Sequence, residues 1–239
     1  MLLSMTYTHI DLAGIVILEP VTSLTDLLTA SVCFFAYWQL RKFQPSHWPT
    51  KALRYYFLCM GGAVGISAVI GHAFLYALTP NWKMLGWTCS GLSIFFIGRS
   101  SILRLQEVFP DKILHIVTLW PVVQYVIFMV AIIWPETRSF DTVKLNATLG
   151  MTLIAIPLQY IIWYKTRHPG HLRFAVGLSM GIFPAIVFNN QITLHTWFNY
   201  HDLSHVLMAI SMFVQFTGVR MIHNTSKVLF PAKPIPATG

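Results

Sequence analysis

The chain has 239 residues, of which 55% are hydrophobic and only 10% are charged, and its mean hydropathy is +0.61. A soluble chain carries about a quarter charged residues, so this composition leaves no room for a soluble domain. The net charge of +8 does not indicate a nucleic-acid partner, because the basic residues flank apolar stretches on one predicted side of a membrane.

Seven apolar stretches follow one another, each close to the roughly 20 residues that cross a hydrocarbon core. Short loops with proline separate them. The sequence therefore predicts an all-α, polytopic membrane protein, a seven-transmembrane-helix bundle formed by residues 1–223, with a Pro-rich, disordered tail at 224–239. The predicted helices cover about residues 17–40, 52–78, 84–105, 112–134, 143–164, 172–194 and 202–222.

The basic residues predict the orientation of this bundle. Loops on one side, together with the C-terminal tail, carry 13 Lys and Arg residues, whereas the other side carries only Lys83, Arg138 and Lys144. The positive-inside rule puts the N-terminus outside and the C-terminus in the cytoplasm.

Acids and histidines occupy unusual places in the first two predicted helices. Glu19 lies in the first turn of helix 1, near the outer face, and Asp26 lies about two turns deeper on the same helix face. Helix 2 runs outward, so His72 lies one to two turns below the outer surface. An ionisable side chain at the centre of a membrane helix costs at least about 2.5 kcal/mol, which favours a functional role.

The last helix opens with H-D-L-S-H, which contains His201, Asp202 and His205. The two histidines are four residues apart and share one helix face. Helix 7 runs inward, so this motif reaches the same depth as His72, and we expect the three histidines to meet if the bundle folds with this topology.

Three histidines and an open position are a frequent zinc shell in enzymes, although imidazole also suits copper, iron and nickel. We therefore predict Zn²⁺ at His72, His201 and His205. Asp202 first and Asp26 second are the candidates for a carboxylate that orients a ligand and moves protons. Glu19 lies nearer the entrance, and His195 in the last outer loop is a candidate lip of the same site.

Other interpretations of these residues stay open at this point. The two histidines of the last helix can bind backbone carbonyls or water without a metal. Glu19, which precedes Pro20, suits a helix N-terminus because the helix dipole favours an acid there. Thr22 or Thr25 can satisfy Asp26 by hydrogen bonding.

The pattern resembles the CREST superfamily of seven-helix membrane proteins, which includes alkaline ceramidases and adiponectin/progestin receptors. The resemblance rests on L-E-P-V-T-S-L-T-D around Glu19, G-H-A-F around His72 and H-D-L-S-H at the last helix. It implies a zinc ion held by the three histidines, and several members of that superfamily hydrolyse a lipid amide or ester. The outside N-terminus resembles the ceramidases, whereas the receptors run the other way.

Two positions depart from that superfamily. It places a serine four residues before the helix-2 histidine, but Ala68 stands there and Ser67, the candidate catalytic serine, comes one residue earlier. One residue turns an α-helix by about 100°, so Ser67 is expected to face elsewhere. The acid expected near the start of helix 3 is absent from W-K-M-L-G-W-T-C-S.

The leading hypothesis is a zinc-dependent membrane hydrolase acting on a lipid amide or ester, with membrane lipids as its partners. The alternatives are a lipid-binding receptor with a structural metal and a small proton-coupled transporter. A catalytic zinc keeps an open position, a structural zinc has a fourth protein ligand, and the transporter needs no stoichiometric metal.

Overall fold

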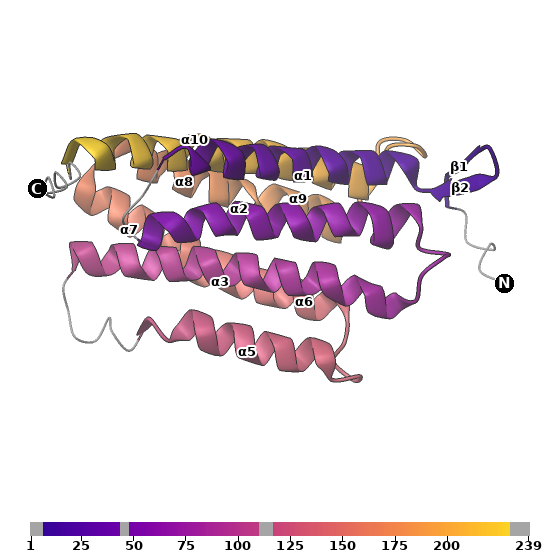
Figure 1. Ribbon diagram of the computed structural model, residues 1–239, viewed down its shortest axis with the longest axis horizontal. Helices are drawn as coiled ribbons and strands as arrows, with labels where there is room; N and C mark the ends of the chain where they lie inside the picture. Colours follow the sequence, from indigo (N-terminus) through magenta and orange to yellow (C-terminus); the bar gives the residue numbers. More distant parts are fainter. Residues whose placement is uncertain (1–6, 44–47, 110–116, 230–239) are drawn as a thin grey trace, which may run out of the picture.

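Seven helical rods run side by side in the computed structural model, which describes residues 7–43, 48–109 and 117–229 (Figure 1). Three rods are composite, because α2 continues into the π-helix η1, α6 continues through the π-helix η3 into α7, and α8 is followed by α9. In chain order the elements are β1 (His9–Leu12), β2 (Ile15–Leu18), α1 (Pro20–Arg41), α2 (Trp48–Ile66), η1 (Ser67–Ala73), η2 (Pro80–Trp82), α3 (Lys83–Val108), α5 (Trp120–Ile133), α6 (Phe140–Thr148), η3 (Leu149–Ala155), α7 (Ile156–Thr166), α8 (Pro169–Met180), α9 (Ile182–Asn189) and α10 (Tyr200–Leu229).

All seven predicted stretches are helical, which confirms the all-α class. The second rod ends earlier than predicted, at Ala73, and α10 extends to Leu229. Residues 112–116 of the fourth stretch and 230–239 of the predicted tail lie outside the described residues.

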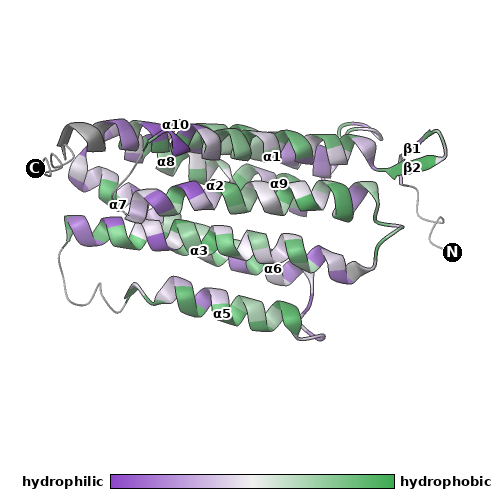
Figure 2. Ribbon diagram, viewed as in Figure 1, coloured by the Kyte–Doolittle hydropathy of each residue, from purple (hydrophilic) through white to green (hydrophobic). Residues whose placement is uncertain are grey.

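Within the described residues, five rods are long and apolar enough to cross a membrane, and the chain is a multi-pass integral membrane protein. Apolar residues occur along the rods (Figure 2), and many of them are exposed; Leu24 and Leu153, for example, are 66% and 67% exposed. Such surfaces suit contact with lipid. The β-hairpin and the C-terminal end of α10 lie at opposite ends of the bundle (Figure 1). The five rods are Pro20–Arg41, Trp48–Ala73, Phe140–Thr166, Pro169–Asn189 and Tyr200–Asn224.

A short antiparallel hairpin precedes α1, which the sequence analysis did not predict. β1 and β2 pair from His9 with Leu18 to Leu12 with Ile15. Ala13 and Gly14 make the two-residue turn, both with positive φ, as in the turns that match the strand twist. The hydropathy pattern joins the strand residues at 17–18 to the apolar stretch of helix 1, which conceals the turn.

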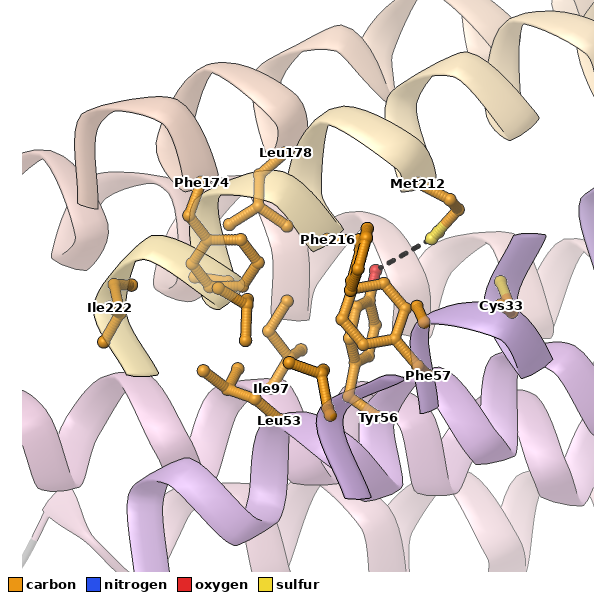
Figure 3. Packing of buried hydrophobic residues seen from close by; sticks show 14 residues of the cluster. Cys33, Leu53, Tyr56, Phe57, Ile97, Phe174, Leu178, Met212, Phe216 and Ile222 are labelled. Carbon is orange, nitrogen blue, oxygen red and sulfur yellow. Dashed lines mark hydrogen bonds between the residues drawn. The ribbon is translucent and has the colours of Figure 1, made fainter. Parts of the chain in front are cut away.

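The core lies where α1, α2, α3, α8 and α10 meet, and side chains of these helices pack together there (Figure 3). Glycines allow α8 and α10 to approach closely. A Cβ atom at Gly218 would lie 2.5 Å from the backbone nitrogen of Phe174, and one at Gly177 would lie 2.7 Å from that of Gln215. Small residues at such crossings are typical of membrane helix pairs.

Candidate metal centre

Three histidines meet at the end of the bundle that carries the hairpin. His72 comes from η1, whereas His201 and His205 come from the first two turns of α10. One ring nitrogen from each lies within 4.8 Å of the other two, and the ring centroids of His72 lie 5.6 Å and 6.0 Å from those of His201 and His205. The predicted meeting of the three histidines is confirmed, and the cluster can hold a metal ion.

The π-helix η1 changes which residues share a face with His72. Its backbone bonds reach five residues instead of four, as in the bond from Phe74 N to Val69 O at 2.9 Å. Ser67 therefore lies about one turn before His72, and its hydroxyl interacts with the Asp26 carboxylate. The expectation that Ser67 faces elsewhere was wrong, because it assumed an α-helical turn. π-helical turns often occur at functional sites.

Glu19 supports His72 directly. It occupies the N-cap position of α1 with φ 43°, a left-handed conformation, and its side chain makes no cap hydrogen bond. Instead its Oε2 lies 2.9 Å from Nδ1 of His72. Burial raises the pKa of Glu19, but the hydrogen bond with His72 and the charges of His72, His201 and Lys83 leave it below its usual range. The side chain of Glu19 therefore orients His72 and does not cap the helix.

This contact determines which nitrogen of His72 is available. A carboxylate acceptor at Nδ1 requires that Nδ1 carries the proton, so Nε2 is left as the ligand atom. The left-handed φ of Glu19 is uncommon for a residue other than glycine. Such a backbone conformation costs about 1–3 kcal/mol where the surroundings impose it.

Asp26 lies between two of the histidines and is 1% exposed. Its Oδ1 is 3.2 Å from Nδ1 of His205, and its Oδ2 is 3.7 Å from Nε2 of His72. Among the described residues, Oδ2 has no hydrogen-bond partner. Thr25 donates to the carbonyl of Thr22 and lies 3.3 Å from Nδ1 of His205, so these threonines do not satisfy Asp26.

Asp202 has a structural role in addition to its place near the histidines. Its Oδ2 accepts the backbone N–H of Asn199 at 2.6 Å, and Oδ1 of Asn199 accepts the N–H of His201 at 2.8 Å. This reciprocal pair is a capping box that starts α10. It holds His201 in place through the backbone.

His195 does not join the histidine cluster. It lies exposed in the loop between α9 and α10, where its Nδ1 accepts the N–H of Trp197 at 3.1 Å. The structure thus brings together Glu19, Asp26 and Ser67 with the three histidines, but it gives His195 contacts within its own loop.

Aromatic rings cover His201, which the sequence analysis did not recognise. The ring centroid of Tyr200 lies 4.2 Å from that of His201, and that of Phe188 on α9 lies 5.2 Å away. Phe188 in turn contacts Phe140, and Nζ of Lys144 lies 5.4 Å from its ring. Tyr200 adjoins His201 in the sequence, but only the packing of α6 and α9 near α10 could reveal the contacts of Phe140, Lys144 and Phe188.

The chain belongs to a family of unknown function, DUF6962, which matches residues 21–224. The matched region contains the three histidines, Asp26 and Ser67, and it begins two residues after Glu19. No curated protein and no solved structure matches this chain.

Proposed function

We propose that this member of the family DUF6962 binds one zinc ion through His72, His201 and His205. Zinc–nitrogen bonds of about 2.0–2.1 Å put the ligand atoms of a tetrahedral shell about 3.3 Å apart. The three ligand atoms already lie within 4.8 Å of one another, so small side-chain rotations would bring them to that spacing. The carboxylates at Nδ1 of His72 and of His205 are the outer partners that zinc-binding histidines usually have.

The observation that carries the proposed activity is the unpaired oxygen of Asp26. The metal cluster contains three histidines and no fourth side chain among the described residues, which leaves a position open. Oδ2 of Asp26 faces Nε2 of His72 without a hydrogen-bond partner of its own. A buried carboxylate oxygen beside an open position is suited to accept a proton from water there.

We infer that the reaction is hydrolysis of a lipid amide or ester. Bound zinc would polarise the scissile carbonyl and make water a competent nucleophile near neutral pH. Asp26 would take the proton from water and return it to the leaving group. Glu19 would keep the imidazole of His72 in its Nδ1–H form, and Ser67 would hold the carboxylate of Asp26.

This assignment reverses the order of the two aspartates given by the sequence. Oδ2 of Asp202 is committed to the capping box of α10, and its Oδ1 has no partner among the described residues. Both oxygens of Asp26, by contrast, lie within 4.0 Å of a histidine nitrogen, at 3.7 Å and 3.2 Å. Asp26 is therefore the proton carrier in this proposal, and Asp202 is a positioning residue.

The resemblance to the CREST superfamily supports the same chemistry and the same arrangement in the membrane. In this proposal all seven rods span the bilayer, with the N-terminus outside and the C-terminus in the cytoplasm, as the distribution of Lys and Arg predicts. The histidine centre then lies near the outer leaflet, from which a lipid substrate enters.

Metal content and activity together test this function. Plasma mass spectrometry of detergent-purified protein should find about one zinc per chain in the wild type and a loss of zinc in His205→Ala. Asp26→Asn should retain zinc and lose hydrolysis of lipid amides and esters. A wild type without metal would overturn the zinc proposal. Loss of zinc in Asp26→Asn would instead make Asp26 a fourth ligand and favour a receptor with a structural metal.

A further inference from the structure

A second group of polar side chains lies buried near the end of α10. Figure 1 shows that α10 ends opposite the hairpin. The group contains Arg54 from α2, Arg104 from α3, His171 from α8 and His223 from α10, which we call the basic cluster. Phe43 contacts two of these residues, because its carbonyl accepts from Nη1 of Arg54 at 3.2 Å and its ring centroid lies 5.5 Å from that of His223. The charge of Arg104 reaches both histidines. Four helices thus bring basic side chains together away from the histidine centre.

Arg104 is the most deeply buried cation of the cluster, at 6% exposure. Among the described residues, Arg104 makes one hydrogen bond, from its Nη2 to Oγ1 of Thr50 at 2.6 Å, and its Nε has no partner. Glu107 is the acid whose charge reaches it, yet no described carboxylate lies within 4.0 Å of the guanidinium. A guanidinium has five N–H donors, so most of its binding capacity is unused here.

Two further nitrogens of the cluster are buried without a partner among the described residues. Nη1 of Arg54 donates to the carbonyl of Phe43 at 3.2 Å, but Nε makes no hydrogen bond. His223 is 3% exposed, and its Nδ1 bonds to the carbonyl of Val219 at 3.0 Å, which leaves Nε2 unpartnered. Three helices therefore each supply an unsatisfied nitrogen at one end of the bundle.

Buried positive charge without a paired carboxylate is unfavourable, and an anion relieves it. Arginine forks match the oxygens of phosphate, and a tetrahedral phosphate offers several acceptors to donors from different helices. The nitrogen Nε2 of His223 can accept from a phosphate hydroxyl or, when protonated, donate to an oxygen. Arg54 is only partly buried, so the cluster reaches the surface on its side.

We propose that the basic cluster binds a phosphate group through Arg54, Arg104 and His223. Two sources share this chemistry, the headgroup of an anionic phospholipid and free phosphate. This site is separate from the histidine centre, and its existence does not depend on zinc or on hydrolysis.

Thermal unfolding in detergent tests the proposal. The protein is purified without phosphate, and its melting temperature is measured with inorganic phosphate, with phosphatidylglycerol in the micelles, and with chloride at matched ionic strength. We expect a higher melting temperature with at least one phosphate source. A shift with inorganic phosphate identifies the free ion as sufficient, whereas a shift with phosphatidylglycerol alone identifies the lipid headgroup.

Substitutions then locate the site. Arg104→Gln and Arg54→Gln should each weaken binding by about tenfold or more, the equivalent of one charge-assisted hydrogen bond. Arg173→Gln removes the same charge from an exposed position on α8 at the same end and should leave binding unchanged. If Arg104→Gln does not fold, Arg54→Gln decides. No stabilisation by either phosphate source, or equal loss in Arg173→Gln, would overturn the proposal.

Discussion

Replacing Glu19 by glycine should separate metal binding from folding. Glu19 is 9% exposed and its carboxylate lies 2.9 Å from Nδ1 of His72, so its removal deletes a charge-assisted hydrogen bond to a partly buried ligand. Such a bond contributes about 1.5–3 kcal/mol, and outer partners of metal-binding histidines change affinity by about 10–100-fold. Both values give an expected increase in the zinc dissociation constant of about one to two orders of magnitude.

The same substitution should leave the metal-free protein nearly as stable as the wild type. Glu19 has φ 43°, a conformation that glycine adopts without steric cost. Relief of about 1–3 kcal/mol of backbone strain then offsets most of the lost hydrogen bond. Glu19→Ala lacks this compensation and should bind zinc as weakly while also being less stable.

Competition for zinc with a chromogenic chelator measures the affinity, and thermal melts followed by circular dichroism measure the stability. Glu136→Gln provides the control, because it removes one acid from an exposed loop far from any histidine in the sequence. Zinc affinity in Glu19→Gly equal to that of the wild type would refute the assignment of Glu19 as the partner that orients His72.

Three further predictions follow from other parts of the structure. Ser67→Ala should reduce hydrolysis about tenfold or more while zinc content stays the same; loss of zinc would disprove its link to Asp26. Gly218→Ala should lower the melting temperature, because its Cβ would lie 2.5 Å from a backbone nitrogen, whereas Gly65→Ala, with contacts of 3.7 Å, should be tolerated. Burial and the charge of Arg104 lower the pKa of His168, whose Nδ1 caps α8. Protonation removes this cap, so stability should fall as the pH drops below the ordinary histidine pKa of about 6.5, and it should fall less steeply in His168→Asn.

The sign of the last effect follows from proton linkage. A histidine with a lowered pKa binds fewer protons in the folded state than in the unfolded chain, so stability rises with pH through this range. Asparagine is also a favourable N-cap residue, and it does not titrate. A pH dependence identical in the wild type and in the variant would contradict the role of the imidazole as a cap.

Hydropathy was sufficient to predict the helical rods, because the membrane imposes both the length and the apolar character of each one. The same pattern could not reveal the hairpin before α1. Its turn depends on two residues with positive φ, and Ala13 gives no sign of this in the sequence. Local backbone choices of this kind differ by only about 1–2 kcal/mol, which the surrounding contacts decide.

The common depth of the three histidines follows from the sequence alone, since alternating helix direction puts the end of helix 2 and the start of the last helix at one depth. The spacing of His201 and His205 then places both on one face of a helix. The roles of the acids required the tertiary structure. The left-handed backbone at Glu19, the π-helical turn that brings Ser67 to the site, and the capping contact of Asp202 each depend on atoms brought together by packing between helices. Composition and periodicity determine which residues reach the same depth in the membrane, whereas only the packed bundle determines which of their atoms touch.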